Sequence, residues 1–263
     1  MSLHFRWLGA AGVELKAGGQ VLAIDPFFTR PTLVQMLKPL KTDQSLVHDR
    51  LPTCNSVLVT HSHYDHLLDV PEVLRHTRAV AYGSTNTCQL LRIFEVPGEQ
   101  LQEVGVGAQL KLGAFHVEVI NGHHSHIPFA GLIDGSLPPG LHPPLRVTDY
   151  RMDICLGYWI TVMGVQLLIC AEEARPADIL FAVAQEPKKY YIDMLNGVRP
   201  DKFIPIHWDN FTRPLNKPVK RFTRPGRLPL WQVAHLARQV SPRLDVIIPE
   251  MFREYTLDAN EIA

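Results

Sequence analysis

Residues 61–66 read His61-Ser62-His63-Tyr64-Asp65-His66, so three imidazoles and a carboxylate lie within one short stretch. They directly follow the apolar residues 56–60, whose alternating valines predict a buried strand. A strand that ends at Thr60 delivers the next residues to the edge of a sheet, where His61 and His63 would point the same way. Imidazole nitrogen and carboxylate oxygen together suit Zn, Mn or Fe. The stretch therefore predicts a metal site rather than a histidine-rich surface turn.

Three later stretches repeat this pattern of an apolar strand followed by residues of metal-ligand type. Residues 117–120 run into a second histidine cluster, residues 165–171 run into Glu172-Glu173, and residues 202–206 run into His207. A single stretch of this kind could hold a packed core histidine or a solvated helix start. All of them together predict one metal centre at the ends of several strands.

With the HxHxDH pattern of residues 61–66, the chain resembles the metallo-β-lactamase-fold hydrolases. The stretches WLGAAGV at residues 7–13 and LAIDPF at residues 22–27 resemble the branch that contains ascorbate-6-phosphate lactonases and N-acyl-phosphatidylethanolamine phospholipase D-like proteins. The resemblance covers nearly the whole chain. It implies an α/β fold, the four-layer αββα sandwich, in a single domain over residues 1–263 with loop insertions at about 29–53 and 127–149.

The resemblance also implies two divalent metal ions, with zinc expected and manganese or iron as alternatives. Their ligands would be His61, His63, Asp65, His66, His124, Glu172 and His207. In the second histidine cluster, His124 is chosen because it precedes a serine and follows Gly122 by two positions. His123 and His126 are the alternatives.

The position that would bridge the two metals departs from the family's usual pattern. This chain has Glu172 where the family usually has Asp. Because Glu is longer by one methylene, it could still bridge, bind one metal only, or leave a site with a single metal. The number of metals therefore stays open.

The expected activity is hydrolysis of a small ester, lactone or phosphodiester by metal-bound hydroxide. Asp65 is the predicted catalytic residue, because a carboxylate at the metal can orient the hydroxide or accept a proton from it. Asp25, at the end of an expected strand over residues 21–24, is predicted to orient a ligand imidazole from outside the ligand set. Its alternative is a turn residue before Pro26.

Two regions are predicted to contact the substrate. The Pro-rich residues 127–149 form a long loop that leaves directly from a predicted ligand cluster, so we expect a wall or lid over the metals. The candidate contacts for a substrate anion are Arg146, Arg151 and Arg213, together with Arg221 and Arg224. Each of these arginines could equally be solvated.

Two other functional classes stay as alternatives. A glyoxalase II-like thioesterase shares HxHxDH, but it usually has Asp at the bridge and a helical C-terminal domain, for which the residues after Phe211 leave little room. A degenerate metal-binding protein with weak or no catalysis would follow if Glu172 has weakened the site.

The composition favours a small-molecule enzyme. Of 263 residues, 46% are hydrophobic, and 26 basic residues balance 26 acidic ones, which argues against a nucleic-acid-binding surface. The absence of a signal-like start and of any apolar stretch of about 18 residues predicts a cytoplasmic protein without a membrane span. A homo-oligomer is left open. The four cysteines lack CxxC spacing and are expected to be free, with Cys170 packed in the core.

Helices are predicted where caps and periodicity coincide. Asp69 is expected to cap a helix that runs to about His76, with Pro71 in the first turn and Glu72 three residues after the cap. Two further helices are expected over residues 85–94 and 229–239.

Overall fold

The strands form two mixed sheets, each with seven strands. The computed structural model describes residues 2–125 and 130–257. Sheet A has the order β14-β1-β2-β3-β4-β5-β6, and sheet B has the order β13-β12-β11-β10-β9-β8-β7. The strand bounds are β1 His4–Gly9, β2 Gly12–Ala17, β3 Gln20–Ile24, β4 Ser56–Leu58, β5 Val80–Gly83, β6 Leu101–Glu103, β7 Gln109–Leu112, β8 Phe115–Asn121, β9 Leu156–Val162, β10 Val165–Ile169, β11 Ile179–Val183, β12 Lys202–Ile206, β13 Asp245–Val246 and β14 Glu254–Thr256.

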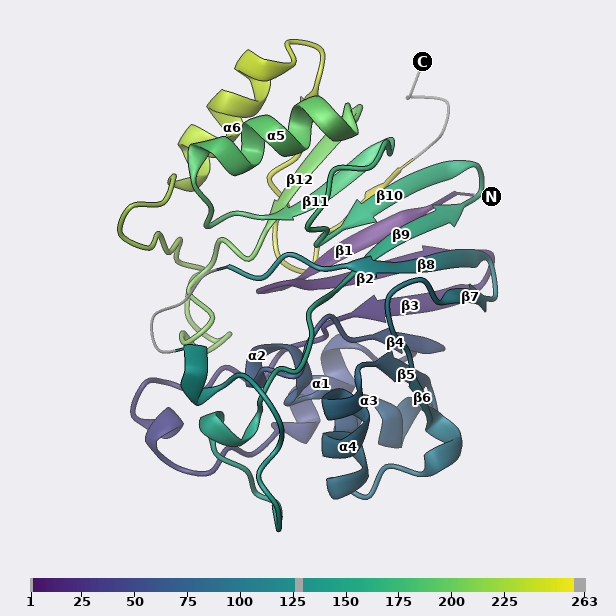
Figure 1. Cartoon of the computed structure of the whole chain (residues 1–263), viewed down its shortest axis with the longest axis vertical. Helices are drawn as coiled ribbons and strands as arrows, with labels where there is room; N and C mark the ends of the chain where they lie inside the picture. The colour runs from purple at the N-terminus through teal and green to yellow at the C-terminus, as the bar shows by residue number, and fades with distance from the viewer. Residues whose placement is uncertain (1, 126–129, 258–263) are drawn as a thin grey trace.

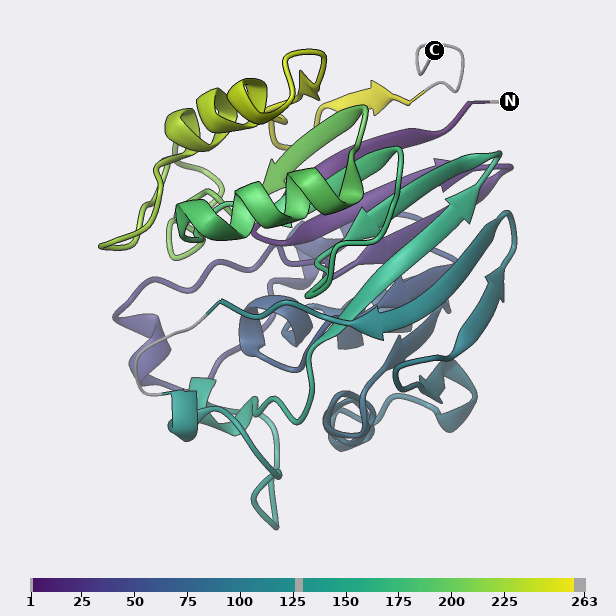
Figure 2. The ribbon, with the colours of Figure 1, turned by 45° about the horizontal axis from the view of Figure 1, so that its top comes forward.

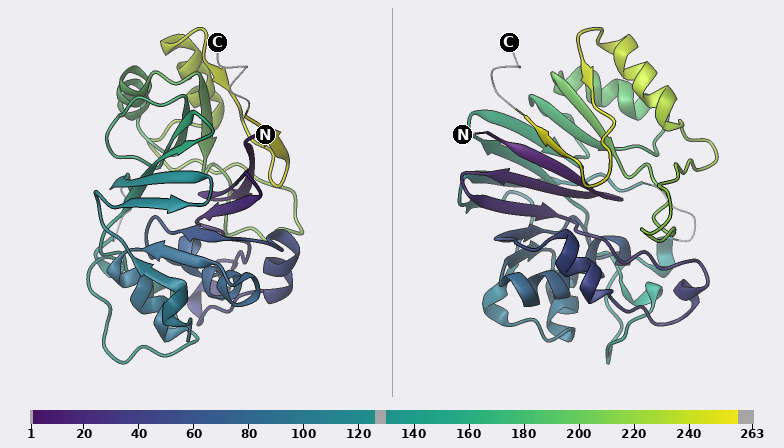
Figure 3. Two further views of the ribbon diagram at one scale, coloured as in Figure 1. Left: turned by 90° about the vertical axis from the view of Figure 1, so that its right-hand side faces the viewer. Right: turned by 180° about the vertical axis from the view of Figure 1, so that it is seen from behind.

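Helices cover the outer face of each sheet. On one side lie α1, α3 and α4, on the other α5 and α6, with both sheets between them (Figure 1). Figure 2 shows α5 and α6 side by side over sheet B, and Figure 3 shows the same layers from the side and from behind. The bounds are α1 Gln44–Arg50, α2 Tyr64–Leu67, α3 Val70–Thr77, α4 Thr85–Ile93, α5 Lys188–Val198 and α6 Leu230–Val240, with 3-10 turns η1 Gln35–Leu37, η2 Gly98–Gln100, η3 Ala130–Leu132 and η4 Val147–Asp149. In the described part of the chain, no helix is long and apolar enough to cross a bilayer.

Three apolar clusters fill the spaces between the layers. The largest lies between the sheets, where Phe5 of β1 meets Phe181 of β11 edge to face with ring centroids 5.5 Å apart. A second cluster joins sheet A to α3 and α4, and a third joins sheet B to α5 and α6. The layers are therefore helix, sheet, sheet and helix, which confirms the αββα sandwich.

Strand direction explains why the predicted ligands meet. In sheet A, β3, β4 and β5 are parallel neighbours. In sheet B, β10, β11 and β12 are parallel neighbours, and β8 runs in the same direction because both β8 and β10 are antiparallel to β9. The residues that follow these strands therefore emerge at one edge of each sheet, where ligands of open α/β sheets commonly bind.

The structure corrects two details of the sequence predictions. Helix α3 begins after Asp69 as expected, but the Asp69 side chain does not cap it; its Oδ2 instead accepts hydrogen bonds from the backbone N–H groups of Phe28 and Thr29, at 2.6 and 2.7 Å. The expected insertion at 29–53 is also not all loop, because it contains η1 and the short helix α1, which is capped by Asp43.

Candidate metal centre

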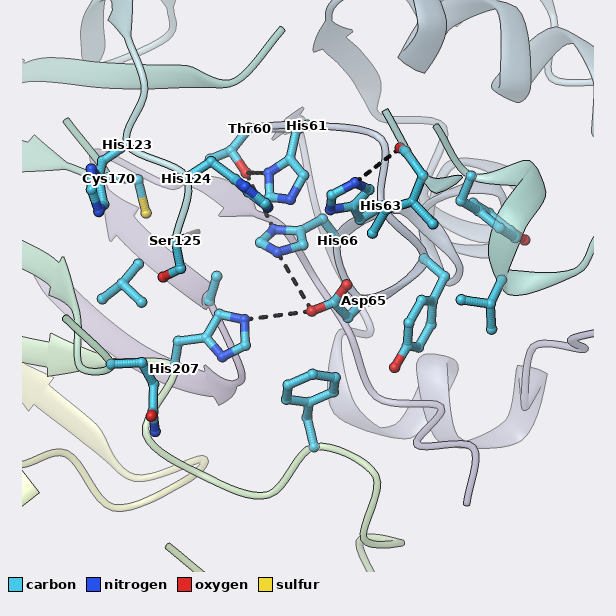
Figure 4. A pocket seen from close by; sticks show the side chains of 18 of the residues that line it. Thr60, His61, His63, Asp65, His66, His123, His124, Ser125, Cys170 and His207 are labelled. Carbon is cyan, nitrogen blue, oxygen red and sulfur yellow. Dashed lines mark hydrogen bonds and ion pairs between the residues drawn. The ribbon is translucent and has the colours of Figure 1, made fainter. Parts of the chain in front are cut away.

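The first group of possible ligands consists of three histidines, His61, His63 and His124. One nitrogen of each lies within 4.8 Å of the others. The ring centroids are 4.6 Å apart for His61 and His63, 4.8 Å for His61 and His124, and 5.0 Å for His63 and His124. Figure 4 shows the rings gathered at one place, although His124 comes from sheet B and the other two from sheet A.

The second group consists of Asp65, His66 and His207, whose ligand atoms also lie within 4.8 Å of one another. Asp65 Oδ2 is 3.5 Å from His207 Nε2 and 3.7 Å from His66 Nε2, as the dashed lines in Figure 4 mark. The two groups are adjacent, because the rings of His61 and His66 are 3.8 Å apart. We call them the first and the second trio.

The path of the chain through residues 61–66 explains this division. β4 ends at Leu58, and His63 is the N-cap of the four-residue helix α2. Asp65 and His66 lie in that helix, so they turn away from His61 and His63 and face the second trio. The HxHxDH spacing thus serves both trios from one turn of chain.

Asp25 orients His66 directly and His61 through Thr60. The buried carboxylate accepts hydrogen bonds from Thr60 N at 2.7 Å, from Thr60 Oγ1 at 2.6 Å and from His66 Nδ1 at 2.7 Å. Since a carboxylate only accepts, the proton of His66 sits on Nδ1 and leaves the lone pair on Nε2. Thr60 gives its single hydroxyl proton to Asp25, so it accepts from His61 Nδ1 at 3.0 Å, which leaves the lone pair of His61 on Nε2 as well.

We expect Asp25→Asn to weaken metal binding at the second trio by about 10- to 100-fold, the usual effect of losing an outer-shell partner. An amide that donates to His66 Nδ1 would move the ring proton to Nε2 and remove the lone pair from the side of Asp65. Metal titration followed by calorimetry measures the change. Asp193→Asn is the control, because Asp193 is exposed on α5, where it pairs with Lys189. Equal metal affinity in Asp25→Asn and the unmutated protein would contradict this role.

Contacts with the N-terminal residues Trp7 and Ala10 position His207. Its backbone N–H donates to the carbonyl of Ala10 at 2.8 Å, and the same carbonyl accepts from Trp7 Nε1 at 2.9 Å. The indole of Trp7 packs on Trp208 with centroids 4.5 Å apart. His207 has a φ of 59°, a conformation rare for a residue with a side chain, so these contacts fix a strained position.

The protonation states suit metal binding. Burial, followed by the neighbouring histidines, lowers the pKa of His61 well below its usual value and that of His124 to about 3. Burial alone would raise the pKa of Asp65, but His66 and His207 outweigh it and hold the pKa below its usual value. At neutral pH His61 and His124 are therefore neutral imidazoles and Asp65 is a carboxylate, the forms that bind metals. Burial lowers the pKa of His66, but Asp25 and Asp65 outweigh it and raise that pKa, so a metal ion at His66 would displace a proton.

The residues present fit divalent metal ions. His61 Nε2 is buried and has no hydrogen-bond partner in the described part of the protein, and a buried polar atom without a partner is costly. His63 Nε2 bonds the carbonyl of Ile133 at 3.2 Å, so its lone pair lies on Nδ1. A set of five imidazoles and one carboxylate suits Zn, Mn or Fe.

The structure does not bring Glu172, the seventh predicted ligand, into either trio. Its carboxylate bonds His123 Nδ1 at 2.7 Å, and its side chain is 56% exposed. The other side of His123 faces Glu186, with Nε2 and Oε1 3.3 Å apart, so this alternative ligand is engaged between two carboxylates. His126, the other alternative, lies outside the described residues.

A third histidine group lies elsewhere, on α1 and α3. One atom each of His48, Glu72 and His76 lies within 4.8 Å of the others. Both ring nitrogens of His76 contact backbone carbonyls, those of Glu72 and Leu51, each at 2.8 Å. Since these nitrogens are engaged within the protein, we do not include the group in the metal centre.

A pocket of about 880 Å³, including its open mouth, leads to the trios. An apolar pocket with a few convergent polar groups is the usual form of a small-molecule site. Its apolar wall comprises Tyr64, Ile133, Val147, Tyr150 and Phe211, and its polar wall includes Ser125, Gln185 and Arg224. Ile133 and Val147 come from the predicted wall loop, and Cys170, expected to pack in the core, is buried but also lines this pocket.

The other predicted anion contacts lie away from the pocket. Arg146 Nη1 donates to the carbonyl of Leu37, and Arg213 Nε donates to that of Pro218. Arg151 makes weak contacts to the carbonyls of Thr148 and Ser136, each at 3.4 Å. Of the five candidate arginines, Arg224 alone is among the residues that line the pocket.

Comparison with known proteins decides the family. The pattern of the Beta-lactamase superfamily domain matches residues 21–141. A UPF0173 metal-dependent hydrolase from Pyrobaculum arsenaticum is 32% identical over 211 residues, which are 80% of this chain and 85% of that protein. The chain belongs to the metal-dependent hydrolases of the beta-lactamase superfamily.

Solved structures agree with the fold of this hydrolase. Igni18, a metallo hydrolase from Ignicoccus hospitalis, is similar with a TM-score of 0.63 and 16% identity, covering 98% of this chain and 99% of the other. The metallo-beta-lactamase fold protein YhfI from Bacillus subtilis has a TM-score of 0.61 and 10% identity, covering 98% and 100%. At these identities the likeness shows the shared fold.

Sequence reasoning missed Gln185 and Glu186, which lie where the hydrolase chain leaves β11. Both are buried, and Gln185 lines the pocket. They follow an apolar strand, Ile179–Val183, in the same way as the predicted ligands follow theirs. That repeated pattern is the signal in the sequence that could have identified them.

Proposed function

We propose that this hydrolase holds two divalent metal ions, one at each trio, and cleaves a small ester, lactone or phosphodiester. The observation that carries the proposal is the contact between the trios, with the rings of His61 and His66 3.8 Å apart. Two complete sets of three donors in contact support a paired site, the arrangement that two-metal hydrolases use. Zinc is the expected metal.

The metal ions and the side chains of the pocket would have separate roles in the reaction. When bound, the metal ions would lower the pKa of a coordinated water and polarise the bond to be cleaved. Asp65 is the proposed proton acceptor, because its carboxylate belongs to the second trio and lines the pocket, beside the position of a coordinated water. Asp25 and Thr60 fix the ring nitrogens, and Tyr64, Tyr150 and Phe211 shield the pocket from water on the apolar side.

The position of Glu172 favours a second candidate, a metal-binding protein with weak catalysis. In this structure no carboxylate of the described residues apart from Asp65 belongs to either trio, so a bridge between two ions would come from water rather than from Glu172. Such a site would bind metal yet lack part of the family's usual machinery.

Metal removal separates the two candidates. We expect dialysis against a chelator to abolish hydrolysis of an aryl ester, a lactone or an aryl phosphodiester, and zinc, manganese or iron to restore it. The measurements are initial rates and metal content per chain; a thioester in the same panel tests the glyoxalase II-like alternative. A protein that binds two metals per chain and hydrolyses none of these substrates would contradict the proposed enzyme.

A further inference from the structure

Arg224 presents a buried, unsatisfied cationic nitrogen at the pocket. Its Nη1 is buried and has no hydrogen-bond partner within the described residues. Arg224 lines the same pocket as His207, Phe211 and the wall loop residues Ile133 and Val147. Arg224 as a whole is half-buried, but a buried guanidinium nitrogen without a partner is costly, so its presence at a pocket points to a ligand that satisfies it.

The backbone around Arg224 is fixed from both sides. Its N–H donates to Gln185 Oε1 at 2.9 Å, and Gln185 Nε2 donates to the carbonyl of Phe222. Gln185 is 3% exposed, so these two hydrogen bonds lie in the protein interior. The position of the arginine at the pocket is therefore built into the fold rather than left to a free loop.

No carboxylate in the described ranges is within ion-pair distance of Arg224. Glu186, whose charge acts on Arg224, is engaged elsewhere: it accepts from Ser125 Oγ, lies 3.3 Å from His123 Nε2 and 3.8 Å from Arg227 Nη1. Burial lowers the pKa of Arg224, and the charges of Asp65 and Glu186 act in the opposite direction. Arg224 thus stays a cation, close enough to Asp65 to feel its charge and without a direct partner.

We propose that Arg224 binds an anionic group of the substrate, a carboxylate or a phosphate, and so selects substrates that carry such a group beside the bond to be cleaved. The planar guanidinium can donate two parallel hydrogen bonds to either anion. The apolar wall of Tyr64, Tyr150 and Phe211 would receive the rest of the molecule. The site of cleavage rests on the proposed function; the binding of the anion does not.

The first test measures binding without catalysis. The probes are phenylacetate, phenylphosphonate and the neutral phenylacetamide, titrated by calorimetry into the metal-stripped full-length protein. We expect one of the two anions to bind, the tighter one identifying the group, and Arg224→Gln to weaken it by about 10-fold or more, as expected for loss of a charge-assisted hydrogen bond. Phenylacetamide should bind both proteins alike.

Matched variants make this result specific. Arg221→Gln removes an exposed arginine of the same segment that does not line the pocket, and it should bind the anion as the unmutated protein does. Arg224→Lys keeps the charge but loses the fork, so it should weaken binding less than Arg224→Gln, and it replaces that variant if Gln prevents folding. Anion binding that is absent, or equal in all these proteins, overturns the proposal.

The second test uses the metal-loaded protein and a pair of aryl esters, 4-nitrophenyl butyrate and 4-nitrophenyl hemiglutarate. Arg224→Gln should lower kcat/KM for the anionic hemiglutarate by about 10-fold or more and leave the neutral ester nearly unchanged. An equal loss of kcat/KM for both esters would contradict the proposal that Arg224 selects substrates by their charge. Arg224-dependent anion binding with no ester hydrolysis would instead contradict the proposed function and leave the anion site standing.

Discussion

His124→Ala and His207→Ala are each expected to remove one metal ion and to lower the hydrolysis rate by at least about 100-fold, the upper end of the effect of losing an outer-shell partner. Each substitution leaves two of the three ligands of its trio. Because His124 and His207 come from different strands of sheet B, neither change disturbs the turn of residues 61–66 directly. The measurements are metal content per chain by elemental analysis and kcat on the best substrate of the panel.

A histidine outside the site provides the matched control. His235 is exposed on α6, where it contacts Gln239, and His235→Ala should keep both metals and full activity. Loss of a single ion from each of the two site variants supports one ion per trio. If either variant keeps two ions with unchanged affinity, the trio that contains the altered residue is not a metal site.

The pattern that could be predicted from sequence is a ligand-type residue directly after an apolar strand. The structure brings His61, His63, His124 and His207 close together, because parallel strands bring their carboxyl ends together whatever the length of chain between them. The sequence predicted only that Asp25 orients a ligand imidazole, with a turn residue as the alternative. In the structure it bonds His66, because β3 and β4 are parallel neighbours.

Side-chain direction at a turn could not be predicted in this way. Cys170 has a φ of 50° where β10 ends, so the alternation of the strand does not continue to Glu172. The backbone N–H of Glu172 bonds the carbonyl of Asn121 at 3.0 Å, and its carboxylate bonds His123. The place of Arg224 at the pocket could not be predicted from periodicity either. Arg224 lies in an irregular segment, and its backbone N–H bonds the side chain of Gln185, which follows another strand, β11.

The second large effect concerns a buried ion pair beside the centre. Arg30 Nη1 lies 2.6 Å from Asp209 Oδ2, and the two side chains are 2% and 0% exposed. Asp209→Ala would leave the guanidinium of Arg30 buried without its counter-charge, which typically costs about 3–5 kcal/mol of the free energy of unfolding. For a chain of this size each kcal/mol lowers Tm by about 2–4 °C. Chemical denaturation and a thermal melt measure the loss.

An exposed ion pair with the same N–O distance serves as the control, because it differs from the Arg30–Asp209 pair in burial and not in distance. Lys189 Nζ and Asp193 Oδ2 are also 2.6 Å apart, but their side chains are 84% and 57% exposed, so Asp193→Ala should cost at most about 0.5 kcal/mol. Replacing both members of the buried pair, as Arg30→Met with Asp209→Ala, should recover part of the loss, because no charge then stays buried alone. A cost for Asp209→Ala as small as that for Asp193→Ala would contradict the assignment.

The same substitution is expected to reach the metal centre. Asp209 Oδ1 accepts from the N–H of Ala10 at 3.0 Å, and the carbonyl of Ala10 accepts from the N–H of His207. Asp209→Ala frees the residue that holds His207 in its left-handed conformation, so metal affinity at the second trio should fall with stability. Affinity measured well below the melting temperature distinguishes the two effects, and unchanged metal binding in a folded Asp209→Ala protein would show that Trp7 and Ala10 position His207 without it.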